Sequence, residues 1–331
     1  MLLRKLVFQA AAVALVLATG TVAEAQQKLR IVSTFDPTHS STQAMQLFKE
    51  IVEKRSNNQL QIDMFDSMKL GGARENVDAT RAGTVFLNWN GMAFLSRIVP
   101  EIEAATLPFM FPNREAAFKA MDGALGTMLD KKLAEKGFIG LGYMELGSRH
   151  VTNSTRPIRA ADDLKGMKIR MQPNETHLAS FRALGANPVS MDIKELYSAL
   201  QQGVVDGQEN PYPVIVANRY FEVQKHLTQT GHFFDFIAIV ANKGQFDALS
   251  GENQKIIREA ATAAVQQQRT VVAKAETDAL QLLKGRMEFH ELTPAEREKM
   301  RAATTGVVDQ LRKRLGDETM DQVLAIVKAG P

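Results

Sequence analysis

The chain alternates strand-like and helix-like segments, and this alternation constrains the fold more than any other feature. The segment 28–35 alternates apolar and polar side chains and is rich in β-branched residues, which predicts a strand. The segment 41–55 places Met45, Phe48 and Val52 on one helical stripe. The same rhythm continues with a strand at 59–65, a helix at 73–83 and a strand at 84–89. A βαβα rhythm predicts a parallel sheet with helices on its faces.

The rhythm restarts in the middle of the chain. A strand is expected at 138–146, and a second segment begins at 149–158. It continues with a strand at 167–171 and helices at 174–185 and 193–202. Asp192 is the expected N-cap of the last helix. Two α/β units joined by crossing segments predict a two-lobed molecule with a cleft between the lobes.

The C-terminal third is helical. Ser250 can cap a helix that ends at Lys284-Gly285, where a basic last turn is followed by glycine. Such a helix is too long for one lobe of ordinary size, so we expect it to run along both.

The N-terminus is typical of a cleavable secretory signal peptide over residues 1–25. Arg4 and Lys5 precede an apolar run, and Ala23-Glu24-Ala25 has the small-x-small pattern of a cleavage site. The alternative is a membrane anchor, but the run is shorter than the ~20 apolar residues that a membrane span needs. No later run is long and apolar enough to span, so we expect a soluble exported protein that is not embedded in a membrane.

Composition excludes several classes of site and partner. The sequence contains no cysteine, which rules out disulfides and thiolate metal ligands. The formal net charge is +3 with acids and bases interspersed, which argues against a nucleic-acid partner. The sequence pI of about 9.0 suits anionic small molecules.

The common motifs of enzymes are missing from the sequence. There is no nucleophile elbow, zinc-protease motif, phosphate loop or dinucleotide fingerprint. The histidines show no close ligand spacing; they stand at 39, 150, 177, 226, 232 and 290. We therefore predict no catalytic residues, no metal site and no cofactor, and a secreted enzyme remains only an alternative.

Polar residues at the ends of predicted strands are the candidates for a binding site, because ligands of open α/β sheets sit outside the carboxyl ends of the strands. Arg170 lies near the end of the strand 167–171, where its planar fork could bind a carboxylate through two hydrogen bonds. Thr34, Asn90 and Arg149 follow other strands. The alternative for any one arginine is a surface charge or an ion pair.

Two further candidates are ambiguous. Asn210 precedes Pro211, which restricts its backbone to an extended conformation and aims its amide. The alternative is a plain turn, and Asp206-Gly207 is expected to be one. Trp89 is the only tryptophan and suits either the core or a cleft wall.

The segment 147–211 resembles the central region of the TRAP-transporter substrate-binding proteins, the DctP-type solute receptors. Three motifs carry the resemblance: L-K-G-x-K-I-R at 164–170, E-L-Y-x-A-L-Q at 195–201 and V-D-G-Q-E-N-P at 205–211. Weaker likeness extends from about 28 to 285 and includes LPFMF at 107–111 and the segment 230–246.

The resemblance implies a two-lobed periplasmic-binding-protein-like α/β fold with a long helix spanning both lobes. Lobe I would comprise 26–146 plus about 235–274, and lobe II 147–234 plus about 275–331. Arg170 and Asn210 would hold the ligand carboxylate, and Arg149 would lie in the site. Looser correspondences fall on Thr34, Trp89 and Asn90, and on one of Phe234, Asp235 and Phe236. Glu209 would be structural, since its charge would repel an anion.

The implied function is binding only. The protein would capture a small mono- or dicarboxylate in the periplasm and deliver it to a TRAP membrane permease, working as a monomer. A receptor that presents its ligand to a membrane sensor would have the same site, so the sequence does not separate these two partners.

Overall fold

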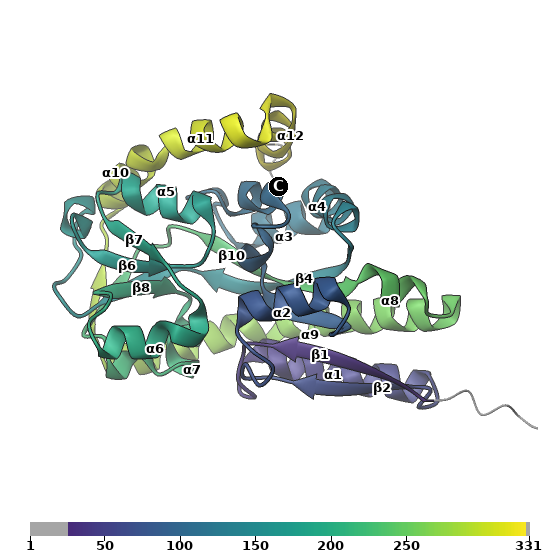
Figure 1. Ribbon diagram of the computed structural model, residues 1–331. Helices are drawn as coiled ribbons and strands as arrows, with labels where there is room; N and C mark the ends of the chain where they lie inside the picture. Colours follow the sequence, from purple (N-terminus) through teal and green to yellow (C-terminus); the bar gives the residue numbers. More distant parts are fainter. Residues whose placement is uncertain (1–25, 329–331) are drawn as a thin grey trace, which may run out of the picture.

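The computed structural model describes residues 26–328 and contains two β-sheets flanked by helices (Figure 1). The first sheet has the strand order β2-β1-β3-β10-β4. β1 is parallel to β2 and β3, whereas β10 runs antiparallel to both β3 and β4. The bounds of its strands are β1 Gln27–Ser33, β2 Leu60–Phe65, β3 Leu87–Gly91, β4 Phe138–Ser148 and β10 Phe234–Asn242.

The second sheet has the order β11-β9-β5-β8-β6-β7. β6 is parallel to β7 and β8, β11 is parallel to β9, and β5 is antiparallel to both of its neighbours. Its strands are β5 His150–Asn153, β6 Lys168–Met171, β7 Asn187–Ser190, β8 Gly207–Asn210, β9 His226–Gln229 and β11 Glu288–Glu291.

Helices cover the faces of both sheets. The α-helices are α1 Ser40–Arg55, α2 Ala73–Ala82, α3 Arg114–Asp122, α4 Ala124–Glu135, α5 Glu175–Ala183, α6 Ile193–Gln201, α7 Tyr212–Ala217, α8 Lys243–Asp247, α9 Gly251–Lys284, α10 Pro294–Thr304, α11 Gly306–Leu315 and α12 Asp317–Lys328. Four 3₁₀ turns complete the described part: η1 Met92–Leu95, η2 Pro100–Thr106, η3 Ala161–Leu164 and η4 Tyr220–Glu222. None of the helices in this range is long and apolar enough to cross a membrane.

The predicted alternation of strands and helices is confirmed in both halves of the chain, but the prediction of a parallel sheet is wrong. Both sheets are mixed and not parallel, because β10 and β5 enter from the opposite sheet and run against their neighbours. The caps are also confirmed: Asp192 accepts a hydrogen bond from the Lys194 amide, and Ser250 accepts one from the Asn253 amide.

The chain crosses between the sheets three times, at 149, at 230–233 and through α9, and the first two crossings are adjacent. β4 ends at Ser148 and β5 begins at His150, so Arg149 lies at the first crossing. The return passes through 230–233 into β10, and the Arg149 amide donates to the Phe233 carbonyl oxygen at 2.9 Å. The backbone therefore holds Arg149 between the two sheets.

Helix α9 contacts both lobes, as its length predicts (Figure 1). Near its start, Ile257 and Ala261 pack in a cluster with α1 and the first sheet. Near its end, Ala279 and Leu283 pack with α6, α7 and β9 of the second. One rigid helix therefore belongs to the cores of both lobes.

The lobe boundaries stay a prediction. Helices α11 and α12 place Leu311, Met320 and Val323 in a cluster with η2 and α4, and both of those elements precede residue 146. This packing favours moving the C-terminal helices toward lobe I. The predicted signal peptide lies outside the described residues.

Candidate ligand-binding site

Arg170 is a fully buried arginine with an incompletely paired guanidinium. It lies in β6 with 0% exposure, and its Nε donates to the Met191 carbonyl oxygen at 2.9 Å. Its Nη1 and Nη2 are buried and have no hydrogen-bond partner within residues 26–328. Burial lowers the pKa of Arg170, although Tyr220 and Glu209 oppose the shift. Burial of two unpaired donors on a cation is costly unless an anion binds them.

Arg149 is equally buried, yet each of its guanidinium nitrogens has a partner. Its Nε and Nη2 donate to the Glu209 carboxylate at 2.5 and 2.8 Å, and Nη1 donates to Asp235 at 3.2 Å. Nη2 also donates to the Asn210 side chain at 3.0 Å. Burial disfavours its charge, but Glu209 and then Asp235 leave the pKa of Arg149 raised. These contacts suit a residue that positions its neighbours.

Glu209 is fully buried and paired with other side chains of the protein, which fits the structural role expected for it. Its carboxylate pairs with Arg149 and lies 3.1 Å from His232 Nε2. Burial would raise the pKa of Glu209, but Arg149 and His232 together hold it well below the ordinary value. The negative charge of Glu209 is therefore neutralised locally and does not face a ligand alone.

Asn210 is the last residue of β8, opposite His150 of β5. Its oxygen accepts from Arg149, and its Nδ2 donates to Gln208 at 2.5 Å. One N–H of the amide is left for another acceptor. A paired strand, the following proline and Arg149 together fix the direction of this side chain.

The turn expected at Asp206-Gly207 is wrong in its second residue. Gly207 is the first residue of β8, pairing with Asn153 of β5 and Ile169 of β6. A Cβ at this position would lie only 2.2 Å from the Thr152 carbonyl oxygen. Glycine is therefore present because β5 approaches closely, and not because a turn needs it.

Residues of the first sheet reach the same region from the other side. The Asn90 side chain accepts from the Thr34 amide at 2.7 Å, so these two predicted residues lie together. A Cβ at Gly91 would lie 3.3 Å from Gln172 Oε1, which places the end of β3 against the residue that follows β6. Both lobes therefore contribute to one polar region.

Trp89 lies in the core of the first lobe with 0% exposure. Its ring packs edge-on against Phe48, with the centroids 5.8 Å apart. Within the described residues its Nε1 has no hydrogen-bond partner. The ring is thus core, whereas the indole N–H is an unpaired donor.

The three residues considered at 234–236 are separated by strand alternation. Phe234 and Phe236 pack against Phe111, with centroids 6.4 and 6.1 Å away. Asp235 points into the polar region, where it accepts from Arg149 and, at 2.8 Å, from Gln172. Packing thus argues against both phenylalanines as ligand residues. Asp235 instead belongs to the polar region, where it holds the side chains of Arg149 and Gln172 in place.

Gln172 and Tyr220 also lie in this polar region, and no sequence motif indicates them. Gln172 could have been found, since it lies two residues after Arg170 and therefore on the same face of the extended chain. Tyr220 lies in η4, far along the chain, and its buried hydroxyl has no hydrogen-bond partner within residues 26–328. It is close enough to Arg170 for the two groups to shift each other's pKa.

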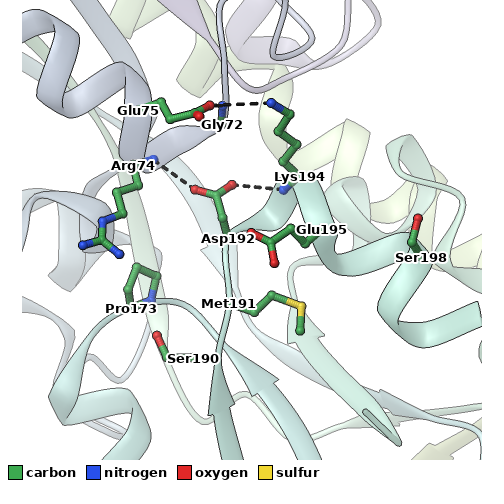
Figure 2. Close-up of a pocket in the computed structure, with 10 residues that line it drawn as sticks. All are labelled: Gly72, Arg74, Glu75, Pro173, Ser190, Met191, Asp192, Lys194, Glu195 and Ser198. Atoms are coloured by element: carbon green, nitrogen blue, oxygen red, sulfur yellow. Dashed lines mark hydrogen bonds and ion pairs between the residues drawn. The ribbon is translucent and has the colours of Figure 1, made fainter. Parts of the chain in front are cut away.

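A cleft of about 720 Å³ opens between the lobes beside this region (Figure 2). Its walls are the start of α2, the segment after β6, and the chain from the end of β7 into α6: Gly72, Arg74, Glu75, Pro173, Ser190, Met191, Asp192, Lys194, Glu195 and Ser198. Asp192 crosses it to accept from the Arg74 amide at 3.0 Å. Met191 connects this cleft to Arg170, which lies behind it.

The chain is similar to known solute-binding proteins. The profile described as "Bacterial extracellular solute-binding protein, family 7" matches residues 31–314. The C4-dicarboxylate-binding periplasmic protein DctP of Rhodobacter capsulatus is 33% identical over 281 residues, which cover 84% of each chain.

Two solved structures are similar over almost the whole chain. The sugar acid binding protein DctPAm from Advenella mimigardefordensis, in complex with galactonate, superposes with a TM-score of 0.89 at 33% identity, over 92% of this chain and 99% of that one. A TRAP periplasmic solute binding protein from Polaromonas sp. JS666 bound to D-erythronate gives 0.86 at 36% identity, over 90% and 98%. This chain therefore belongs to family 7 of the bacterial extracellular solute-binding proteins, the DctP family of TRAP periplasmic receptors, which bind solutes for transport and are not enzymes.

Proposed function

We propose that this protein binds a small organic-acid anion between its lobes and that Arg170 is the counter-ion of the ligand carboxylate. The pairing of Arg170 carries the proposal: Nη1 and Nη2 are buried donors without a partner within residues 26–328. A carboxylate offers two oxygens in the plane of this fork and would accept both hydrogen bonds. Asn210 would donate its remaining N–H to the same carboxylate.

The ligand is proposed to be a monocarboxylate that carries hydroxyl groups. A second carboxylate beside Arg170 would need a second unpaired cation there, and the three nitrogens of the neighbouring Arg149 are already bound by Glu209, Asn210 and Asp235. Trp89 Nε1 and the Tyr220 hydroxyl are neutral buried groups that suit the hydroxyl groups of a ligand. The galactonate and D-erythronate of the two similar structures are of this chemical class, whereas the relative from Rhodobacter capsulatus is named for C4-dicarboxylates.

The proposed site acts within a transport system. The signal-like segment 1–25 would direct export to the periplasm, where the relative from Rhodobacter capsulatus is placed by its name. The loaded receptor would then deliver its solute to a TRAP permease. A membrane sensor is the alternative partner, and uptake of labelled ligand by cells with and without the permease genes separates the two.

A thermal-shift screen tests the proposed ligand class. Galactonate and erythronate should each raise the melting temperature, succinate should raise it less, and neutral galactose should not raise it. A ligand present at 100 times its dissociation constant stabilises the folded state by about 2.7 kcal/mol. A shift with galactose and none with any of the acids would overturn the proposal. A larger shift with succinate than with either sugar acid would leave an organic-acid receptor but overturn the monocarboxylate assignment.

A further inference from the structure

The edge of the second sheet carries three potential metal ligands on one face. β11 is the edge strand and pairs in parallel with β9, so that Glu288 lies directly opposite His226. His290 is two residues further along β11 and therefore projects on the same side as Glu288. The intervening pair, Leu227 and Phe289, faces the apolar cluster beneath α6 and α9.

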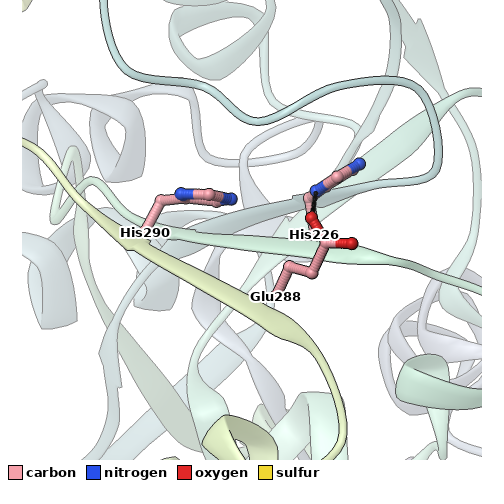
Figure 3. Close-up of side chains that lie close together, drawn as sticks. All are labelled: His226, Glu288 and His290. Atoms are coloured by element: carbon pink, nitrogen blue, oxygen red, sulfur yellow. Dashed lines mark ion pairs between the residues drawn. The ribbon is translucent and has the colours of Figure 1, made fainter.

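The three side chains converge at the surface (Figure 3). One ligand atom from each of His226, Glu288 and His290 lies within 4.8 Å of the other two. His226 Nδ1 and Glu288 Oε2 are 3.1 Å apart, but they are not aligned as a hydrogen bond. His226 is only 4% exposed, and its Nδ1 and the Nε2 of His290 are buried atoms without a hydrogen-bond partner within residues 26–328. One cation could be bound at the same time by a lone-pair nitrogen of each imidazole and by the Glu288 carboxylate.

We propose that His226, Glu288 and His290 form a binding site for a divalent transition-metal ion, with Zn²⁺ the best match. Two imidazoles and one carboxylate are ligands that Zn²⁺ accepts in tetrahedral sites, with water able to take the fourth position. Hard cations such as Ca²⁺ and Mg²⁺ prefer all-oxygen ligands and do not match this set. The site lies at the strand edge, separate from the ligand site proposed around Arg170.

Metal binding requires a small closure of the three side chains. Ligand atoms at about 2.0–2.2 Å from one Zn²⁺ lie roughly 3.4 Å apart in a tetrahedron. In the structure the three ligand atoms lie within 4.8 Å of one another, so they would have to move closer together. His226 is fixed by burial, whereas Glu288 is 53% exposed and free to rotate. Lys225 Nζ lies 3.6 Å from Glu288 Oε1 and competes for this carboxylate, but its own side chain is 65% exposed and can turn away.

The neighbouring groups on this face do not supply a fourth ligand. Asn153 lies opposite His226 on the other side of β9, and its oxygen already accepts from the amides of Thr155 and Arg156. Thr228 lies opposite His290 and donates to the Ile158 carbonyl oxygen. The ion would therefore be held by three protein ligands and open to solvent. It would also clamp β11, the strand that follows α9, onto β9.

Titration of the metal-free protein tests the site directly. The exported protein, purified without a histidine tag and treated with a chelator, is titrated with ZnCl₂ by calorimetry and with CoCl₂ by absorption spectroscopy. One ion per chain should bind, and the Co²⁺ spectrum should be that of a tetrahedral centre. His226→Ala and His290→Ala should each weaken Zn²⁺ binding by at least about tenfold, since even the loss of an outer-shell partner costs 10–100-fold.

Matched variants on the same strand separate ligation from charge. Glu291 is exposed and adjacent to His290, but alternation places it on the other face, so Glu291→Gln should keep wild-type affinity whereas Glu288→Gln should not. Lys225→Gln should tighten binding. Circular dichroism confirms folding of each variant. No Zn²⁺ uptake by the wild type, unchanged affinity in either histidine variant, or equal losses in the two glutamate variants would overturn the assignment.

Discussion

Two arginines of this fold are buried to the same extent but have opposite surroundings. Arg149 is paired with Glu209 and Asp235, whereas Arg170 donates one hydrogen bond to a carbonyl oxygen and pairs with no carboxylate within residues 26–328. A buried ion pair is strongly destabilised when one partner is removed, since the other charge remains in a medium of low polarity. The two side chains should therefore respond to substitution in opposite ways.

Arg170→Met should abolish the melting-temperature shift caused by sugar acids and raise the melting temperature of the ligand-free protein. The substitution removes the donors of the ligand site, and it also removes an unpaired buried cation in exchange for an apolar side chain of similar length. Calorimetric titration and thermal unfolding measure the two effects. Wild-type affinity for a sugar acid in the folded variant would contradict the ligand assignment.

Glu209→Gln should instead destabilise the protein, by about 3–5 kcal/mol, because it leaves the positive charge of Arg149 short of a partner. The pKa of Glu209 is lowered by Arg149 and His232. The ionised Glu209 therefore contributes its full stabilisation to the folded protein above the unfolded-state pKa of 4.5, and this stabilisation declines as the pH falls below that value. Urea unfolding at pH 7 measures the loss, and a loss below about 1 kcal/mol would show that Asp235 alone can neutralise Arg149.

Elements held by their own periodicity are predictable from this sequence, and those held by neighbours are not. The stripe of Met45, Phe48 and Val52 predicts α1, and the structure buries all three side chains. β8 is four residues of glycine, amides and an acid, and it is a strand only because β5 and β6 bond to it on both sides. No local pattern reveals such a strand.

Gly207→Ala should therefore disrupt β8. The added methyl group would meet the Thr152 carbonyl oxygen at 2.2 Å, and a backbone atom within a sheet cannot easily move away. We expect a loss of stability together with weaker ligand binding, because Asn210 is on the same strand. Gly306→Ala is the control, since a Cβ there has no atom within 4 Å among the described residues. Equal stability of the two variants would refute this explanation.

Helix α1 should make the stability of the protein dependent on pH. His39 caps the helix by accepting from the Ser41 amide through Nδ1, and burial lowers its pKa from 6.5 to about 4 despite the nearby Asp36. The unfolded chain therefore binds a proton that the folded chain does not, so stability is lost as the pH falls from 6.5 toward 4.

His39→Asn should remove this dependence, because asparagine is a strong N-cap that does not titrate. The wild type should lose up to about 2 kcal/mol more than the variant between pH 6.5 and pH 5. Urea unfolding at the two pH values measures the difference, and at pH 8 the two proteins should show equal slopes with pH. Parallel curves across the acid range would mean that His39 is not the titrating group.

The whole molecule brings together residues that the sequence keeps far apart. Arg149 meets Asp235, which is 86 positions away, only because the chain crossings at 149 and at 230–233 are adjacent. His226 meets Glu288 and His290 only because β11 pairs with β9 after the long passage of α9. The family motifs therefore pointed to Arg170 and Asn210, but the frame around them depends on tertiary pairing that local spacing does not encode.

Closure of the lobes should depend on Asp192, although this residue is not proposed to contact the ligand. Its carboxylate caps α6 through the Lys194 amide and also accepts from the Arg74 amide across the cleft (Figure 2). Asp192→Ser keeps a helix cap but is too short for the second contact. The closed state should lose one hydrogen bond of about 0.5–1.5 kcal/mol, which corresponds to a roughly 2- to 10-fold weaker affinity with faster ligand release.

Glu75→Gln is the matched control, because it removes a negative charge at the same rim, 3.6 Å from Lys194 Nζ, and leaves both hydrogen bonds of Asp192 in place. Stopped-flow release of the ligand should be near wild type in this variant and faster in Asp192→Ser, with unfolding free energies alike in all three proteins. Equal acceleration in the two variants would assign the effect to the loss of a negative charge at this rim and not to the Asp192–Arg74 hydrogen bond. Unequal release would instead show that a single hydrogen bond at the rim of the cleft controls how long the two lobes remain closed on their solute.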